Sequence, residues 1–191
     1  MNVAPADRVF SSFPEFDAGD LRLRALRVAD AEHLYAIFSD EQVTEHYDLD
    51  TFSDPRQALE LIERFKGRYA NRIGLRWAIV RKESPDTVLG TCGYNLWIQP
   101  SSRAVLGFDL KRRHWRQGIM SQALQATLAF GFGPMDLNRV EALSFTQNTA
   151  SRRLLEKLGF SCDGVLREYE LVKGRFVDMA MYSLLRREYA P

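Results

Sequence analysis

Residues 107–121 read Gly-Phe-Asp-Leu-Lys-Arg-Arg-His-Trp-Arg-Gln-Gly-Ile-Met-Ser, and this stretch decides the fold. The pattern predicts a short apolar strand, a tight basic turn and then a helix. A loop that leads into a helix presents unpaired backbone N–H groups, and cationic side chains surround them here. Because the field at a helix N-terminus favours anions by roughly 0.3–1 kcal/mol per surface charge, we expect this loop to bind pyrophosphate without a metal.

Size and composition are those of an ordinary globular protein. The chain has 191 residues, 46% hydrophobic and 27% charged, which predicts a single domain over 1–191 with residues 1–19 as a turn-rich extension on the surface. A net charge of +1 creates no global field for nucleic acid or an anionic membrane. Residues 1–16 lack a secretory-signal pattern and no apolar run could span a membrane, so we expect a cytoplasmic protein.

The cysteines and histidines do not have the spacing of a zinc site, and no metal is expected. The chain contains two cysteines and three histidines, which are far apart in sequence: Cys92, Cys162, His33, His46 and His114. We interpret the thiols as buried and reduced, and a Cys–His nucleophilic pair remains an alternative.

Two helices are predicted in the first half of the chain. Asp30 would cap the first, and Asp54 the second, where Pro55 and Gln57 complete a capping signature. The residues at helical spacing that would be buried are Leu34, Ile37 and Phe38 in the first helix, and Leu59, Ile62, Phe65 and Tyr69 in the second.

The other signals alternate strands and helices, which predicts a mixed α+β domain. Helices are expected over 121–130 and from Asn148 or Thr149 to Gly159. Alternating or apolar runs bounded by turn residues predict strands over 21–26, 77–80, 88–94, 104–110, 139–145, 165–172 and 176–184, with hairpin turns at 84–86 and 173–174.

The order of strand, basic turn, helix, strand, Asn148, helix and Gly159-Phe160 resembles the GNAT superfamily of acyl-CoA-dependent N-acetyltransferases. Segments 148–160 and 164–185 are similar to the RimJ/RimL subgroup, which acetylates ribosomal-protein N-termini. The similarity spans 20–188 and is most specific over 104–184. It implies a twisted, mostly antiparallel mixed sheet with a V-shaped splay between two central strands and helices on both faces.

The resemblance implies that the basic loop binds the pyrophosphate of acetyl-CoA. Gly118 would allow close backbone approach, and Arg113 or Arg116 would screen the charge. Met120 stands where the family prefers Gly or Ala, and we expect its side chain to point to the core. The cofactor-binding residues expected in the loop are Arg113, Arg116, Gln117, Gly118, Ile119, Met120 and Ser121.

The resemblance also implies that the pantetheine arm of CoA pairs with the splayed strand at Phe108, Asp109 and Leu110. Asn148 would anchor the arm, or act only as a helix N-cap. Arg153, with Arg152 and Lys157, would reach the adenosine phosphate or form a solvated helix face. The run 111–113 is interpreted as facing phosphate, with nucleic acid as the alternative.

Acyl transfer requires a neutral amine and a proton for the departing thiolate. Ser151 resembles the serine that serves the thiolate in RimL-type enzymes, or it is a small residue in the first helical turn. Many relatives have a tyrosine four residues later, where this chain has Leu155. Glu141 is the candidate general base, or it is exposed or paired with an arginine. Glu45, His46 and Asp109 are lesser candidates.

These features predict an N-acetyltransferase that moves an acetyl group to a primary amine. An α-amino group, with a pKa of about 7.7–8, needs about 1 kcal/mol to be neutral at pH 7, whereas lysine needs about 4–5. A protein N-terminus, of the ribosomal-protein type, is therefore the first candidate acceptor. The alternatives are a small-molecule amine (amino acid, polyamine or aminoglycoside), a non-catalytic acyl-CoA sensor, and a generic nucleotide-phosphate binder. Tyr47 and Trp97 lie in segments that often line the acceptor site, and the chain would be a monomer or homodimer.

Overall fold

The strands form one eight-stranded sheet. The computed structural model describes residues 4–190, in which the strands follow the spatial order β1-β2-β3-β4-β5-β6-β8-β7. Neighbouring strands are antiparallel except β5 and β6, which are parallel. The strands are β1 (Phe16–Ala18), β2 (Leu21–Ala25), β3 (Leu75–Arg81), β4 (Ser84–Ile98), β5 (Arg103–Leu110), β6 (Arg139–Phe145), β7 (Ser161–Val172) and β8 (Arg175–Leu185).

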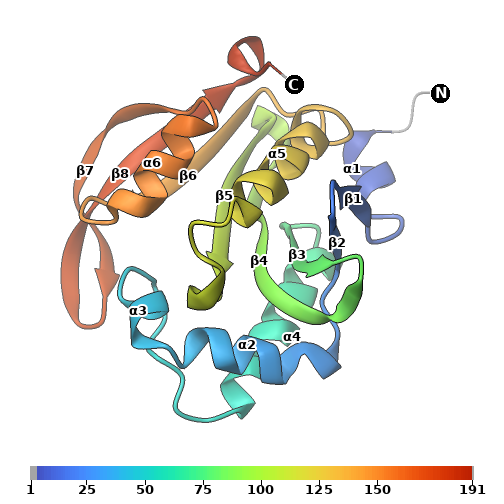
Figure 1. Ribbon diagram of the computed structural model, residues 1–191. Coiled ribbons are helices and arrows are strands. Elements are labelled where there is room, and N and C mark those ends of the chain that lie inside the picture. The colour runs from blue at the N-terminus through green and yellow to red at the C-terminus, as the bar shows by residue number, and fades with distance from the viewer. Residues whose placement is uncertain (1–3, 191) are drawn as a thin grey trace.

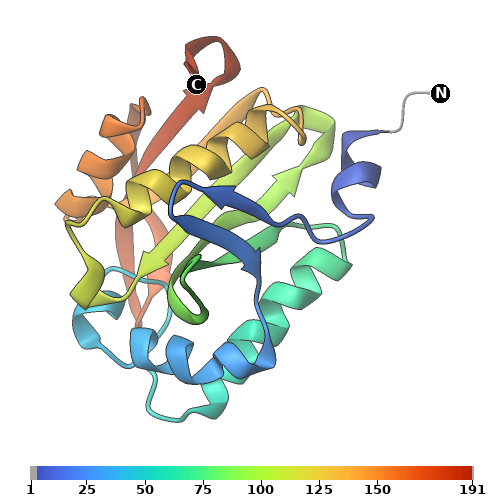
Figure 2. The same ribbon diagram turned by 45° about the vertical axis from the view of Figure 1, so that its right-hand side comes forward.

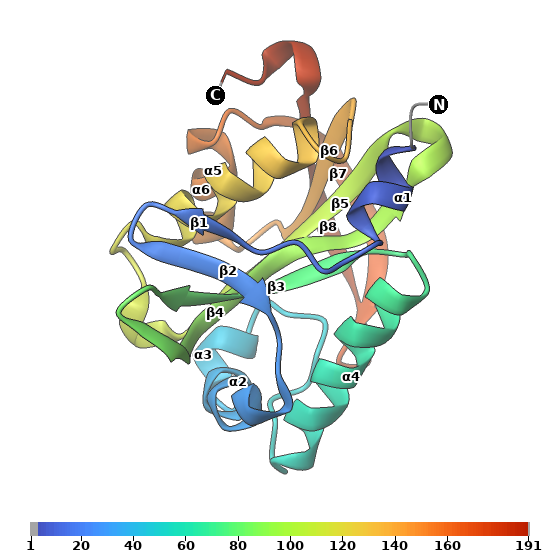
Figure 3. The same cartoon turned by 90° about the vertical axis from the view of Figure 1, so that its right-hand side faces the viewer.

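Helices cover both faces of this sheet (Figure 3). Helices α5 and α6 lie on one face, and α5 packs next to β1 and β2, which cross it in the view of Figure 2. Helices α2 and α4 pack on the other face over a second apolar cluster. None of the helices in residues 4–190 is long and apolar enough to cross a membrane. The helices are α1 (Pro5–Val9), α2 (Ala31–Phe38), α3 (Glu41–Thr44), α4 (Arg56–Ala70), α5 (Ile119–Phe132) and α6 (Thr149–Lys157).

The two central strands part halfway along their length. β5 and β6 pair only from Arg103 with Arg139 to Leu106 with Ala142, although β5 continues to Leu110 and β6 to Phe145. Helix α5 supplies the crossover that a parallel pair requires. Figure 1 shows the two strands diverging toward α3. The predicted α+β fold with a V-shaped splay is confirmed.

The predicted capping is confirmed for α4 but not for α2. Asp54 Oδ1 accepts a hydrogen bond from Arg56 N at 2.8 Å, and Gln57 Oε1 accepts one from Asp54 N at 2.9 Å. Asp30 makes no capping bond to α2, because a 3-10 turn over Val28–Asp30 already gives it helical backbone angles. A capping side chain needs an extended backbone instead.

Three other predictions differ from the structure. Leu59 is 40% exposed, because the buried stripe of α4 runs through Ala58 and Leu61, one residue out of phase with it. The β3–β4 turn is at 82–83, since Arg81 already pairs with Ser84, so 84–86 belong to β4. The turn-rich segment 1–19 contains helix α1 and edge strand β1, while residues 1–3 lie outside the described range.

Candidate active site

A cleft of about 1010 Å³ lies where β5 and β6 part. One end, called the phosphate end after its predicted ligand, is formed by residues of the loop 111–118, the first turn of α5, and Arg153 and Lys157 of α6. The other end, called the acceptor end after its predicted role, is formed by residues 42–48 except Thr44, together with residues from the middle of the sheet and from the β7–β8 hairpin. The fold therefore brings segments from the whole chain to one cavity.

The loop at the phosphate end carries a row of free backbone donors. Arg116 and Gly118 adopt left-handed φ values of 61° and 78°, so the chain turns sharply into α5, whose first helical bond is Gln122 N to Gly118 O at 3.0 Å. Within residues 4–190, the six N–H groups of 116–121 find no protein acceptor. Alternating left-handed residues and a helix N-terminus make an anion-binding concavity.

Cationic side chains border these donors, although not all the predicted ones. Arg116, Arg153 and Lys157 line the cleft. Arg113 and Gln117 do not line it, since the Gln117 amide donates to the Arg113 carbonyl at 2.8 Å and the Arg113 guanidinium lies beside His114. Burial, with the charges of Arg113 and Lys111, lowers the pKa of His114. The free donors and three cations fit a pyrophosphate-bearing ligand.

The first three residues of α5 have different surroundings. Met120 is 7% exposed and packs in the main core, as expected for a side chain that points inward. Ile119 is also buried at the cleft wall, and Ser121 lines the cleft beside it. The buried side chains of Ile119 and Met120 therefore leave the backbone donors of the first turn of α5 open to a ligand.

The free edge of β5 forms one long wall of the cleft. Phe108, Asp109 and Leu110 all line it, and they lie beyond the last residues paired with β6. An unpaired strand edge can bond an extended ligand as an additional strand. The Asp109 side chain does not take part, because it turns into the buried cluster described below.

Asn148 both caps a helix and faces the cleft. Its Oδ1 accepts a hydrogen bond from Ser151 N at 3.0 Å at the start of α6, and the residue lines the cavity. Capping uses the amide oxygen, which leaves the Nδ2 donors for another partner. The two interpretations of Asn148 are therefore compatible.

In α6, Ser151 matches the family pattern and Leu155 departs from it, and the two side chains have different surroundings. Ser151 lines the cleft and is half-buried. Leu155 is fully buried in the main core and does not line the cleft. Arg152 donates to Tyr182 Oη and to the Thr146 carbonyl, each at 3.0 Å, so it ties α6 to the sheet rather than facing a phosphate.

Glu141 is not placed to act as the general base. Its carboxylate accepts hydrogen bonds from Arg103 at 2.7 Å and from Arg139 at 2.8 Å, and it does not line the cleft. It lies in the part of β6 that still pairs with β5, beside Val105. Of the alternatives for Glu141, the structure therefore has the one in which the carboxylate pairs with arginine. Neither Cys92 nor Cys162 lines the cleft, and Cys162 is exposed, so the prediction that both thiols are buried is wrong for that residue.

Contacts between segments that are distant in sequence span the acceptor end. Lys173 Nζ, at the tip of the β7–β8 hairpin, donates to the Thr44 carbonyl at 2.7 Å. Arg112 of the loop pairs with Asp40, the cap of α3, at 2.7 Å. The His46 ring lies 5.8 Å from that of Phe145. The short helix α3 thus bridges the two diverging halves of the sheet.

Several titratable side chains line the acceptor end. They are Glu45, His46, Tyr47, Asp48 and Glu170. Burial raises the pKa of Tyr47, which keeps its hydroxyl protonated. Trp97, by contrast, is a core residue packed against Phe10.

A buried polar cluster supports the floor of this end, and sequence patterns did not predict it. Arg76 of β3 pairs with Asp109 at 2.6 Å, and the Thr91 hydroxyl donates to the same carboxylate at 2.6 Å. The Arg76 guanidinium also donates to Asn95 Oδ1 at 3.2 Å. The available signal was two polar residues, Arg76 and Asn95, that directly flank the strands predicted over 77–80 and 88–94.

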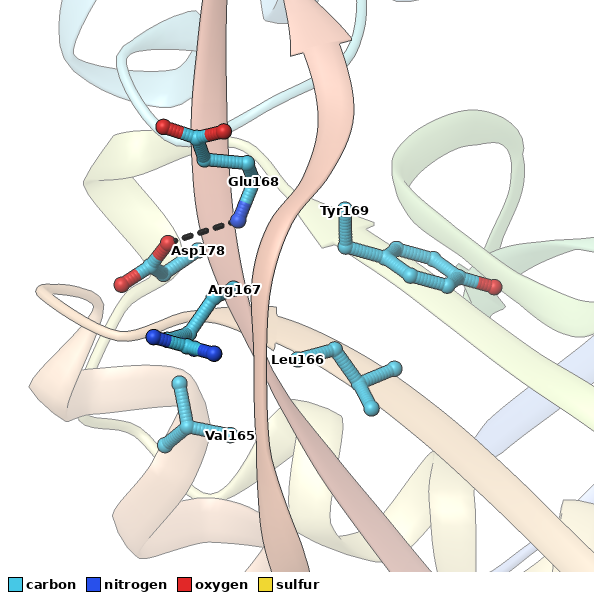
Figure 4. Close-up of a pocket in the computed structure, with 6 residues that line it drawn as sticks. All are labelled: Val165, Leu166, Arg167, Glu168, Tyr169 and Asp178. Carbon is cyan, nitrogen blue, oxygen red and sulfur yellow. Dashed lines mark hydrogen bonds between the residues drawn. The ribbon is translucent and has the colours of Figure 1, made fainter.

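A second hollow lies on the β7–β8 hairpin, and the described residues that line it form no buried polar cluster. It is lined by Val165–Tyr169 and Asp178 and is open to solvent (Figure 4). It forms where the β7–β8 pairing slips between Leu166 and Glu170, and Asp178 Oδ1 accepts from Glu168 N there at 2.8 Å. This bond satisfies the irregular backbone, and no buried side chain converges on the hollow.

The chain belongs to the GNAT acetyltransferases, because the family profile described as "Acetyltransferase (GNAT) domain" matches residues 20–161. The predicted family is therefore confirmed, and the protein is an N-acetyltransferase.

Proteins similar in sequence to this chain match it over nearly its whole length. The chain is 41% identical to the uncharacterized N-acetyltransferase p20 of Bacillus licheniformis, over 89% of this chain and 95% of that protein. It is 36% identical to the uncharacterized N-acetyltransferase YoaA of Bacillus subtilis (strain 168), over 91% and 98%. The structure of RimL, a ribosomal L7/L12 α-N-protein acetyltransferase in complex with coenzyme A, matches with a TM-score of 0.80 and 19% identity over 90% and 98%. That last likeness concerns the fold.

Proposed function

We propose that this enzyme transfers an acetyl group from acetyl-CoA to a primary amine, and that the preferred acceptor is the α-amine of a protein N-terminus. The observation that carries the first part is the row of six free N–H groups at 116–121 beside three cleft cations. These groups would hold the pyrophosphate, and the free edge of β5 would bind the pantetheine arm.

The charges of the cleft support a cationic acceptor. Arg116, Arg153 and Lys157 line the phosphate end, whereas Glu45, Asp48 and Glu170 line the acceptor end. Carboxylates at the open rim raise the local concentration of ammonium groups. An α-amine then loses its proton at low cost, about 1 kcal/mol at pH 7. RimL, which shares the fold, is named as an acetyltransferase of such an N-terminus.

Proton transfers are assigned to side chains that line the cleft. Glu45 and His46 lie at the acceptor end and would take the proton of the amine, directly or through water. Ser151 lines the cleft in the first turn of α6 and would supply a proton to the departing thiolate.

A small-molecule amine is a second candidate acceptor, favoured by one observation. The bond from Lys173 to the Thr44 carbonyl spans the acceptor end and narrows it. A narrowed cleft admits a small amine or the extended end of a peptide, but not a folded surface.

The direct test is turnover with acetyl-CoA and a panel of amines, followed by release of the CoA thiol. The panel contains peptides with a free N-terminus, the same peptides with a blocked N-terminus and an internal lysine, and small amines. Cys162 is exposed and would react with the thiol reagent, whereas burial raises the pKa of Cys92 to about 12. The assay should therefore use Cys162→Ser.

Each outcome selects one function. Faster turnover of free N-termini supports the proposal, and faster turnover of small amines supports the second candidate. Absence of turnover despite CoA binding would favour a non-catalytic acyl-CoA sensor. Equal protection against thermal unfolding by ATP and CoA would favour a generic phosphate binder.

Ser151→Ala tests the proton donor. We expect kcat to fall by about 100-fold, with little change in the KM for acetyl-CoA, because Ser151 would act on the leaving thiolate and its backbone N–H would still reach Asn148. Wild-type kcat in the variant would make Ser151 a structural residue of the first helical turn.

A further inference from the structure

Asn95 occupies an irregularity of β4 at the centre of the cleft. Tyr94 pairs with Leu106 and Leu96 pairs with Val105, so Asn95 is an extra residue in the β4–β5 ladder. Such a bulge re-aims a side chain without ending the strand. The Asn95 side chain lines the cleft.

Two arginines determine which way the Asn95 amide faces. Arg68 Nη1 and Arg76 Nη1 each donate to Asn95 Oδ1 at 3.2 Å. A guanidinium has donors and no acceptor, so only the amide oxygen can face the two arginines. The Nδ2 group, which lies in the same amide plane on the other side of Cγ, must then point away from the two arginines.

The Nδ2 group remains available to a ligand. Within residues 4–190 it donates no hydrogen bond to protein, and His33 Nδ1 is the one buried side-chain nitrogen or oxygen there without a partner. Asn95 Nδ2 is therefore open to the cleft. A fixed donor that is open to a ligand is pre-organised, since binding does not have to reorient it.

The position of Nδ2 coincides with the point at which the sheet splits. A Cβ atom on Gly107 would collide with Asn95 Nδ2 and lie 2.7 Å from Arg76 Nη1. Gly107 immediately follows Leu106, the last residue of β5 that pairs with β6. From Lys111 to Gly107 the strand edge extends about 13 Å, so an arm that enters from the phosphate loop ends beside this amide.

We propose that Asn95 Nδ2–H donates a hydrogen bond to the thioester carbonyl oxygen of acetyl-CoA and stabilises the oxyanion that forms during transfer. The assignment rests on the proposed function. The neutral amine nitrogen attacks the thioester carbon, and the carbonyl electron pair moves to oxygen, where Asn95 donates. Collapse restores the carbonyl and breaks the C–S bond. The amine proton goes to the base at the acceptor end, and the thiolate takes a proton to give free CoA.

Asn95→Asp separates this role from a structural one. The carboxylate still accepts from Arg68 and Arg76 but places an anionic oxygen where Nδ2 was. We expect kcat to fall by about 100- to 1000-fold, with CoA affinity unchanged and thermal stability equal or higher. Asn71→Asp is the control, because it adds the same charge at an exposed residue at the end of α4, and we expect wild-type kcat there.

Gly107→Ala provides a second test by a different route. The added methyl group displaces the Asn95 amide and should also lower kcat, and combining it with Asn95→Asp should cause little further loss. Wild-type kcat in Asn95→Asp would overturn the assignment of Asn95. Lack of turnover by the wild-type enzyme with every amine would instead contradict the proposed function, so the two failures are distinguishable.

Discussion

The two ends of the cleft are built in different ways. The phosphate end uses backbone N–H groups of consecutive residues, 116–121, held by the φ angles of Arg116 and Gly118. The acceptor end uses side chains from segments far apart in sequence, such as Tyr47, Arg76 and Asn95. Backbone donors depend on local conformation, whereas side-chain donors depend on the packing of the whole sheet. The two ends should therefore respond differently to substitution.

Arg76→Met should have the largest effect on stability. The variant leaves the Asp109 carboxylate buried without its partner, and the side chains of this pair are 2% and 1% exposed. Removing one partner of a buried ion pair costs about 3–5 kcal/mol. Urea unfolding, followed by circular dichroism, measures the loss.

Arg24→Met is the matched control for Arg76→Met. Arg24 and Asp30 form a comparably buried pair, with side chains 1% and 3% exposed, away from the cleft. Both variants should lose similar stability, but only Arg76→Met should lower kcat, because it frees the Asn95 amide. Unchanged kcat in Arg76→Met would mean that the buried cluster does not position the acceptor end.

Gly118→Val should have the next largest effect, on CoA affinity. Gly118 has a φ of 78° and open space around the position of a Cβ atom, so the cost is backbone strain of order 1–3 kcal/mol rather than a clash. Relief of this strain turns the N–H groups away from the ligand. We expect CoA to bind roughly 10- to 100-fold more weakly by isothermal calorimetry.

Gly174→Val separates strain from ligand binding. Gly174, in the β7–β8 turn, has the same φ of 78° and the same open surroundings, yet it does not line the cleft. It should lose comparable stability and bind CoA like the wild type. If Gly118→Val also binds CoA normally, the loop 111–118 is not the phosphate site.

Asn148 variants should have the smallest effects. Asn148→Ala removes the α6 cap and should cost about 1 kcal/mol of stability. Asn148→Asp keeps an oxygen for Ser151 N but removes the Nδ2 donors, so stability should hold while the KM for acetyl-CoA rises by about 2- to 10-fold. A wild-type KM in Asn148→Asp would show that this residue acts only as a cap.

Local sequence patterns predicted the phosphate end better than the acceptor end. The strand predicted over 139–145 has the observed bounds, and α6 begins at Thr149 after Asn148. The helix after Gly118 begins two residues earlier than expected, at Ile119. Capping, glycine and turn signals act over a few residues, so sequence patterns detect them.

Predictions failed where a residue's partner is distant in sequence. Glu141 is a plausible base by its strand position, but Arg103, 38 residues away, holds its carboxylate. Asp30 has the sequence context of a cap, yet it pairs with Arg24 across a 3-10 turn. Each outcome depends on contacts that no local pattern contains.

The sequence by itself determined the family, the order of the central elements and the position of the basic loop that opens α5, because these follow from periodicity, glycine positions and turn residues over short segments. Only the tertiary structure decided which side chains reach the cleft. Arg76 and Asn95 lie on neighbouring strands, and the β4 bulge turns Asn95 toward the split between β5 and β6. That arrangement depends on sheet register, which is set by packing between residues far apart in the chain.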